Sequence, residues 1–192
     1  MTNILRVKCA VIGDAAIGKT ALIQVFLHDR SYFPKNYSMT TGVTLSVGKV
    51  NIPDTKDAVE LYLYDCSGKE VYLDLVQELW ADAPLAIIMF DTCNEPSFQH
   101  VSTWASRLSK NSTCGPKIGV LVGMKADLKE RRKVSTREGQ EMAERIGFHY
   151  LESSAVKSVK KEAEGVQEPF FYLASQWHKT HNEKGELQDD VL

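Results

Sequence analysis

The segment Gly13-Asp14-Ala15-Ala16-Ile17-Gly18-Lys19-Thr20 constrains this chain most strongly, because it matches the pattern GxxxxGK[ST]. It joins an apolar run, Leu5 to Ile12, to an amphipathic run, Thr20 to Leu27, and so predicts a sharp turn from a strand into a helix. In such a turn, backbone N–H groups surround a phosphate and the helix N-terminus adds positive potential. We expect Lys19 to reach the outer phosphates of a nucleotide and Thr20 to hold magnesium. Glycines also serve ordinary turns, but the Lys-Thr pair favours phosphate binding, and Gly13 to Ala21 form the candidate site.

Strand and helix patterns alternate along most of the chain. Runs suitable for strands are Leu5 to Ile12, Val43 to Val50, Val59 to Asp65, Leu85 to Asp91, Ile118 to Met124 and His149 to Glu152. Apolar residues recur at helical spacing in Thr20 to Leu27, Val71 to Trp80, Ser97 to Lys110, Thr136 to Ile146 and Pro169 to Lys179. The alternation predicts an α/β fold with a mostly parallel six-stranded sheet and helices on both faces. Together with the GxxxxGK[ST] turn, it resembles the fold of the P-loop NTPases.

One pair of strands breaks this alternation. Val43 to Val50 and Val59 to Asp65 are joined only by Asn51 to Ala58, which is too short for a crossover helix. These two strands are therefore expected to form an antiparallel hairpin at the edge of the sheet.

Length and composition fit one globular domain. The 192 residues are 43% hydrophobic, which is enough to bury a continuous core. We expect a single nucleotide-binding domain over residues 1–181 and a flexible tail over 182–192. A formal net charge of -2 provides no general basic field for nucleic acid or an anionic membrane.

The cysteines point to a reducing, intracellular compartment, because none of them is spaced as a metal-ligand pair. They are Cys9, Cys66, Cys93 and Cys114. The longest apolar run, Ala83 to Phe90, is too short to span a bilayer. Thr2 does not fit a myristoylation motif, and Asp189 to Leu192 contain no cysteine for prenylation, so we expect no direct lipid anchor.

A second phosphate signal closes a predicted strand at Asp65-Cys66-Ser67-Gly68, which reads DxxG. The carboxylate of Asp65 can hold magnesium, usually through water, and the N–H of Gly68 can meet the terminal phosphate. On its own this pattern is weak, because Asp and Gly often close a strand as an ordinary turn.

Two further segments indicate which base is bound. In Gly123-Met124-Lys125-Ala126-Asp127, the carboxylate of Asp127 can accept two hydrogen bonds from one edge of guanine, a donor pair that adenine lacks. The stem of Lys125 can cover the face of the ring. Glu152-Ser153-Ser154-Ala155 ends the next strand, where a backbone N–H can meet the guanine carbonyl oxygen. Each segment alone could be a plain loop, but their order and spacing together favour guanine.

Together these motifs resemble the small GTPases of the Ras superfamily, and the Rab branch most, over roughly residues 4 to 180. The resemblance implies GTP or GDP and Mg²⁺ as ligands, with Thr20, Thr40 and Asp65 at the metal. It also implies that Lys19, Thr40 and Gly68 support hydrolysis, that Phe33 packs on guanine and that Tyr37 closes over the phosphates. From the residues alone, the segment Phe33 to Val43 is only a polar loop with aromatic residues.

A closer resemblance is to the Rab-like GTPase subunits of the intraflagellar transport complex. It rests on segments that include Tyr37 to Val43, Ile52 to Thr55, Asp65 to Glu70 and Glu168 to Phe170. The resemblance implies a cytoplasmic protein of cilia and flagella, and a small β-sandwich companion subunit that binds the C-terminal part of the domain.

The chain departs from the family pattern at four places. Lys69 stands where most of these GTPases have the glutamine that orients the attacking water, and a cation without an acceptor cannot orient it, so hydrolysis should be slow. Met124 replaces an asparagine whose amide ties the guanine loop to the phosphate loop, which should weaken base binding. Val156 replaces a lysine beside the backbone group that meets the base, with little expected effect. Ala15 and Ala16, where well-known members have glycines, should still admit nucleotide.

Two surfaces are candidates for partners. Tyr62 and Tyr64 lie on the predicted outer face of the hairpin, where related proteins present aromatic residues to effectors, although tyrosine also suits any half-exposed strand. In the last helix Phe171 and Tyr172 fall outside the apolar stripe of Phe170, Leu173, Ala174 and Trp177, which indicates an additional apolar contact.

Three functions are compatible with parts of this pattern. The favoured one is a GTP/GDP switch with slow hydrolysis that acts, as the resemblance implies, as a subunit of intraflagellar transport. A structural subunit that uses nucleotide only as a folding cofactor is kept open by Lys69 and Met124. An ATP-dependent phosphotransferase is disfavoured, because Asp127 fits guanine and not adenine.

Overall fold

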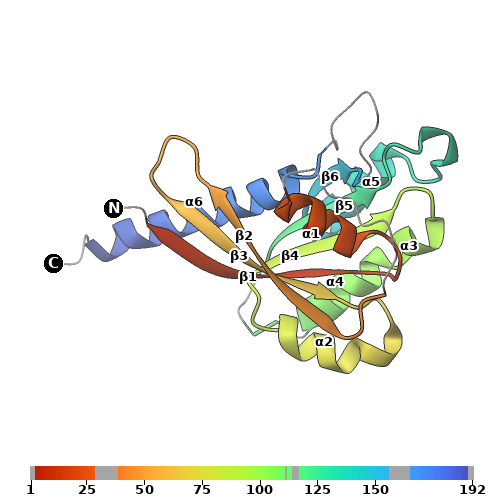
Figure 1. Cartoon of the computed structure of the whole chain (residues 1–192), viewed down its shortest axis with the longest axis horizontal. Helices are drawn as coiled ribbons and strands as arrows, with labels where there is room; N and C mark the ends of the chain where they lie inside the picture. The colour runs from red at the N-terminus through yellow and green to blue at the C-terminus, as the bar shows by residue number, and fades with distance from the viewer. Residues whose placement is uncertain (1–2, 29–38, 111, 114–116, 156–164, 190–192) are drawn as a thin grey trace.

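A computed structural model describes residues 3–28, 39–110, 112–113, 117–155 and 165–189 of the chain (Figure 1). Its strands are β1 (Ile4–Gly13), β2 (Val43–Asn51), β3 (Ala58–Cys66), β4 (Leu85–Asp91), β5 (Ile118–Met124) and β6 (His149–Ser153). Its helices are α1 (Lys19–Leu27), α2 (Leu73–Trp80), α3 (Glu95–Gln99), α4 (Val101–Lys110), α5 (Thr136–Ile146) and α6 (Glu168–Asp189), with single 3₁₀ turns η1 (Glu70–Tyr72) and η2 (Lys129–Arg131).

The six strands form one sheet in the order β2-β3-β1-β4-β5-β6. β2 and β3 pair antiparallel, and the other neighbours pair parallel. The prediction of a mostly parallel sheet with one antiparallel hairpin at its edge is confirmed. Since parallel strands share their direction, the carboxyl ends of β1, β3, β4, β5 and β6 meet at one edge of the sheet.

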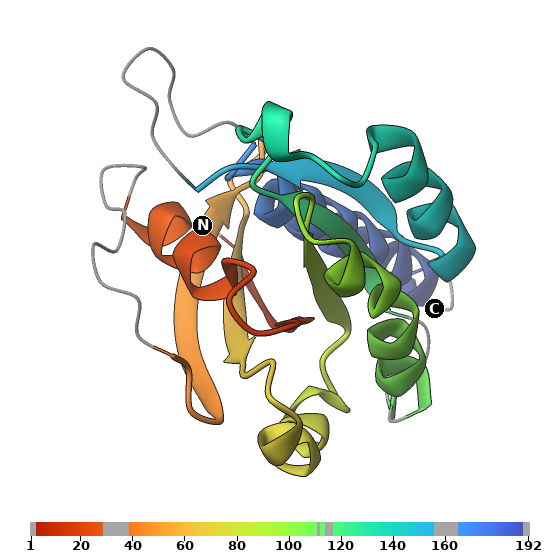
Figure 2. The same ribbon diagram turned by 90° about the vertical axis from the view of Figure 1, so that its right-hand side faces the viewer.

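Helices cover both faces of the sheet, as Figures 1 and 2 show. On one face, α1 and α6 bury Phe26, Phe170 and Leu173, and the rings of Phe26 and Phe170 stack with centroids 3.9 Å apart. On the other face, α2, α4 and α5 bury Trp80, Trp104 and their neighbours. The sheet is thus closed on both faces, and the edge where the parallel strands end is left for loops.

The predicted helices are confirmed, with differences at their ends. Ser97 to Lys110 is divided into α3 and α4 at His100, and α3 begins at Glu95 because the side chain of Asn94 caps it by accepting from the N–H of Ser97. The predicted helix Thr136 to Ile146 has the bounds of α5, which a reciprocal capping box between Ser135 and Glu138 begins.

The last helix is longer than predicted. The expected end at Lys179 is wrong, because α6 continues to Asp189 through residues predicted as a tail. The residues after Lys179 include the good helix formers Glu183, Lys184, Glu186, Leu187 and Gln188, and one glycine, Gly185, raises the cost of a helix without ending it. A division between domain and tail after residue 181 stays a prediction. No helix in the described part of the chain is long and apolar enough to cross a membrane.

Candidate nucleotide-binding site

The phosphate-loop motif forms the turn between β1 and α1. Gly13 and Gly18 have φ angles of 137° and 108°, and Ala16 has a φ of 62°, so the turn uses backbone conformations that favour glycine. A Cβ on Gly13 would lie 2.3 Å from the carbonyl oxygen of Met89 in β4. Glycine at this position is therefore required both by the backbone angle and by the neighbouring strand.

Lys19 begins α1 and is turned back over the loop. Its Nζ donates to the carbonyl oxygens of Gly13 at 2.9 Å and Asp14 at 2.6 Å. The side chain is 6% exposed, and burial lowers the pKa of Lys19 to about 8 although the charge of Asp65 opposes this shift. The ammonium group is thus held at the centre of the loop, where an anion would stabilise its charge.

Three oxygen side chains converge beside Lys19. The hydroxyl of Thr20 donates to Oδ2 of Asp65 at 2.5 Å and lies 3.0 Å from the hydroxyl of Thr40, which reaches the same Oδ2 at 3.5 Å. Burial raises the pKa of the Asp65 carboxyl, and the hydrogen bond from Thr20 partly counteracts that effect. The structure thus brings together the three residues predicted at the metal.

The second carboxylate oxygen of Asp65 tests whether this cluster fits a cation. Within the described residues, Oδ1 of Asp65 is buried and has no hydrogen-bond partner. A buried carboxylate oxygen without a partner is costly, and a hard cation or its bound water would satisfy it. Two hydroxyls and one carboxylate are the oxygen ligands that Mg²⁺ prefers when phosphates complete its shell. The residues therefore fit a magnesium ion.

Gly68 lies directly against the phosphate loop. A Cβ on Gly68 would come within 2.3 Å of the backbone nitrogen of Ala15 and the carbonyl carbon of Asp14, so only glycine allows this approach. Lys69, the next residue, is exposed and stands at the start of η1. The structure therefore places Lys69 beside the phosphate loop with its side chain in solvent.

The candidate base loop follows β5. Met124 is 2% exposed, and its methyl carbon would lie 3.3 Å from a Cβ on Gly18, so it packs toward the phosphate loop without a hydrogen bond. Lys125 has a φ of 62°, and its Nζ pairs with Oδ2 of Asp91 at 2.5 Å. Asp91 ends β4, one strand away.

Asp127 and the end of β6 complete this loop. Asp127 is exposed, and its Oδ1 accepts from the hydroxyl of Ser154 at 2.7 Å. The N–H of Ala126 donates to the carbonyl of Ser153 at 3.3 Å, and Ala155 is buried beside them. The two predicted base segments, distant in sequence, are thus in contact at one point of the sheet edge.

Three predicted site residues, Phe33, Tyr37 and Val156, lie outside the described residues.

Four residues in contact with the site were not predicted from the sequence. Trp104 donates to Oδ1 of Asp14 at 2.8 Å, and Nδ1 of His100 lies 2.7 Å from Oδ2, so the start of α4 holds the phosphate loop. Asp91 and Thr92 contact the base loop. The only sequence signal for Asp91 was its position at the end of a buried strand, where site residues of parallel sheets gather. Nothing in the sequence pattern signals the other three.

Sheet order, the phosphate loop and the guanine-type loop together define a P-loop nucleotide-binding protein of the small GTPase class. The chain matches the model of the Ras family over residues 8–179, and it belongs to that family. Membership implies binding of guanine nucleotide and Mg²⁺ and hydrolysis of GTP.

Among curated proteins the chain is similar to intraflagellar transport protein 27 and to Rab proteins. The "Intraflagellar transport protein 27 homolog" of Bos taurus is 40% identical over 183 residues, which cover 95% of this chain and 96% of that protein. "Intraflagellar transport protein 27" of Chlamydomonas reinhardtii is 34% identical, over 96% of this chain and 90% of that protein. "Ras-related protein Rab-2B" of Dictyostelium discoideum is 34% identical, over 85% and 76%. The chain is therefore a Rab-like member of the Ras family.

Proposed function

We propose that this protein is a GTP/GDP-binding switch with slow GTP hydrolysis that acts as a Rab-like subunit of intraflagellar transport in the cilium or flagellum. The main support for a nucleotide switch is that Thr20, Thr40 and Asp65 converge beside Lys19. Among the described residues, one buried carboxylate oxygen of Asp65 has no hydrogen-bond partner. Thr40 precedes β2 and Asp65 is the next-to-last residue of β3, so two separate segments meet at one point. The assignment to intraflagellar transport rests on similarity over nearly the whole chain.

In this proposal the phosphate end of the site comprises Gly13 to Ala21, Thr40, Asp65 and Gly68. It binds the nucleotide phosphates and Mg²⁺ through backbone N–H groups and through lysine, threonine and aspartate side chains. Lys19 exchanges its contacts with the loop carbonyls for phosphate oxygens, and the N–H groups from Gly13 to Ala21 surround the phosphates. Thr20, Thr40 and Asp65 hold Mg²⁺, which supplies charge neutralisation on the transferred phosphoryl group when it is bound. Gly68 brings its N–H toward the terminal phosphate, because its close approach to Ala15 holds the segment that follows β3 against the phosphate loop.

The base end is proposed to select guanine through Asp127. Its carboxylate accepts from the two N–H donors of guanine, the Lys125 stem covers the ring, and a backbone N–H at Ser154 or Ala155 meets the guanine carbonyl. Ser154 orients the carboxylate through the 2.7 Å hydrogen bond.

Asp127→Asn tests this assignment. The amide replaces an acceptor pair by one acceptor and one donor, which mismatches guanine and suits xanthine. We expect the variant to prefer xanthosine triphosphate to GTP in competition binding. A variant that still prefers GTP shows that another residue reads the base.

A structural subunit that holds nucleotide only as a folding cofactor is the second candidate. It is favoured by the exposed Lys69 where a water-orienting glutamine is expected, and by Met124 in place of an amide. The nucleotide released when the purified protein is denatured distinguishes the two. GTP and GDP, exchanging with added nucleotide, support the switch, whereas one nucleotide that does not exchange in the native protein supports the folding role.

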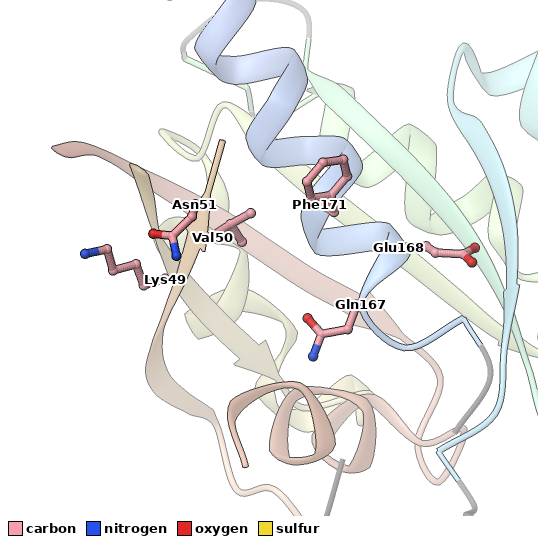
Figure 3. Close-up of a pocket in the computed structure, with 6 residues that line it drawn as sticks. All are labelled: Lys49, Val50, Asn51, Gln167, Glu168 and Phe171. Atoms are coloured by element: carbon pink, nitrogen blue, oxygen red, sulfur yellow. The ribbon is translucent and has the colours of Figure 1, made fainter. Parts of the chain in front are cut away.

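Two surfaces are proposed for partners. Phe171 is 42% exposed and lines a hollow of ≈ 290 Å³ between the start of α6 and β2, together with Lys49, Val50, Asn51, Gln167 and Glu168 (Figure 3). This position suits the proposed companion subunit, which would cover the apolar ring. Tyr172 instead stacks on His149 with ring centroids 4.3 Å apart, so its ring already has a partner. Tyr62 and Tyr64 are half-buried on β3 and are proposed to face an effector.

A further inference from the structure

Two side chains at the end of β4, those of Asp91 and Thr92, bond to the base loop that follows β5. Asp91, Met124 and Ser153 are aligned in the register of three neighbouring strands, at the carboxyl ends of β4, β5 and β6. Residues that follow β4 therefore lie next to the loop that follows β5. Thr92 is fully buried and Asp91 is 6% exposed, so their polar groups are hydrogen-bonded inside the protein and not to solvent.

Thr92 joins several segments through its backbone and its hydroxyl. Its N–H donates to the carbonyl of Met124 at 3.0 Å, and its hydroxyl donates to the same carbonyl at 2.9 Å and approaches that of Lys125 at 3.4 Å. Its own carbonyl accepts from the N–H groups of Lys133 and Val134 at 2.9 and 3.0 Å. The hydroxyl thus adds a side-chain bond at the peptide where the strand becomes the base loop.

Asp91 acts on the same loop through charge. Oδ2 pairs with Nζ of Lys125 at 2.5 Å, while Oδ1 accepts from the N–H of Cys93 at 2.8 Å, which fixes the carboxylate. Lys125 holds a positive φ of 62°, an unusual conformation for a lysine that needs support from outside the residue. The pair directs the Lys125 side chain toward β4.

Met124 explains why such support matters in this chain. A thioether cannot donate a hydrogen bond, so Met124 packs toward Gly18 but does not tie the base loop to the phosphate loop by a hydrogen bond. We propose that Thr92 and Asp91 are positioning residues for guanine recognition, which hold the base loop from β4 in place of the amide that Met124 lacks. The proposal rests on the guanine site proposed above.

Thr92→Val tests the hydroxyl, because valine keeps the shape and removes the donor. The variant loses one buried hydrogen bond while the carbonyl that accepted it remains. We therefore expect GDP to bind roughly two- to tenfold more weakly, which is the usual effect of one such bond. Thr92→Ser should recover most of the lost affinity. The matched control is Thr180→Val, which removes a hydroxyl bonded to the carbonyl of Gln176 at 2.9 Å within α6, far from the base loop, and should leave GDP affinity unchanged.

The ratio of GDP to inosine diphosphate affinity separates positioning from a general loss of folding. Inosine diphosphate lacks one of the two donors that Asp127 reads, so a loosened loop should discriminate less between them. We expect the ratio to fall in Thr92→Val and in Asp91→Asn, which removes the charge opposite Lys125. A smaller folded fraction would lower both affinities and leave the ratio unchanged, which would overturn the proposal.

Restoring an amide at position 124 gives an independent test. If Thr92 stands in for that amide, Met124→Asn should recover GDP affinity in the Thr92→Val protein by a larger factor than it improves the unsubstituted protein. Equal factors would show that the two positions act independently and would contradict the proposal. A protein without any preference for guanine would instead contradict the proposed function itself, so the two failures can be told apart.

Discussion

The phosphate end and the base end of the site differ in how their polar groups are paired. At the phosphate end, Lys19 donates to the carbonyl oxygens of Gly13 and Asp14, and Asp65 keeps a buried oxygen that is unpaired among the described residues. At the base end, the charged side chains pair with protein groups, Lys125 with Asp91, Asp127 with Ser154 and Arg132 with Glu152. The phosphate end thus keeps polar groups that a ligand could satisfy, whereas the charged side chains of the base end already have partners within the protein.

This difference has an energetic consequence. A buried charge or carboxylate oxygen without a partner destabilises the folded state, and a ligand that satisfies it contributes that energy to binding. A base loop that is already held in place contributes less to affinity in this way. It also loses little conformational entropy when the nucleotide binds, which favours selection of one base over another. We therefore expect affinity to depend mainly on the phosphate end and base choice on the other.

Removal of Mg²⁺ should have the largest effect. With EDTA, GDP release should accelerate at least about tenfold, since each charge-assisted contact at this end contributes roughly 1.5–3 kcal/mol. Stopped-flow release of a fluorescent GDP measures this rate. Asp65→Asn is the matched variant, and it should release GDP quickly with or without EDTA. An unsubstituted protein whose release rate ignores EDTA has no metal at Thr20, Thr40 and Asp65.

Restoring the water-orienting amide should have the next largest effect. Lys69→Gln should raise single-turnover GTP hydrolysis on the order of tenfold while GTP affinity stays nearly constant, because the amide acts on the attacking water and not on the bound ground state. Lys69→Ala is the control and should leave the slow rate near its starting value. A sharp fall in the alanine variant would make Lys69 itself catalytic.

A smaller effect is expected where α4 supports the phosphate loop. Trp104→Phe removes the hydrogen bond to Asp14, worth about 1 kcal/mol, and should weaken GDP binding roughly fivefold, measured by calorimetry. Trp80→Phe is the matched control in the same apolar cluster, because Nε1 of Trp80 has no hydrogen-bond partner in the described part of the chain. It should lower thermal stability without changing GDP affinity. Equal loss of affinity in both variants would indicate a packing effect alone.

More of the phosphate loop than of its supporting contacts could be predicted from the sequence, and the reason is physical. Gly13 to Thr20 is one contiguous segment whose conformation depends on its own glycines, so its pattern identifies it. Trp104 reaches Asp14 across 90 residues of sequence, and only the packing of α4 on the sheet brings them together. Thr92 occupies an ordinary strand end, and its role emerges from the strand register. The length of α6 was missed because helix formers after Lys179 carry no apolar stripe to reveal it.

The smallest predicted effect tests whether the base end holds itself together without a ligand. Arg132 donates to both carboxylate oxygens of Glu152 at 2.8 and 2.6 Å, and these bonds lower the pKa of Glu152 below its usual 4.5. A lowered folded-state pKa contributes stability that is present above pH 4.5 and is lost as pH falls through the folded value. Glu152→Gln should therefore lower the free energy of unfolding by about 1 kcal/mol or less at pH 7, and the difference should become smaller at a pH below 4.5. Chemical denaturation at both pH values measures it, with Glu141→Gln, which breaks the exposed pair with Arg137, as a control that should change little.

The pair of Arg132 and Glu152 forms without a ligand, so saturating GDP should leave the effect of Glu152→Gln at pH 7 unchanged. An effect that appears only with GDP would show that the base end, too, is assembled by its nucleotide.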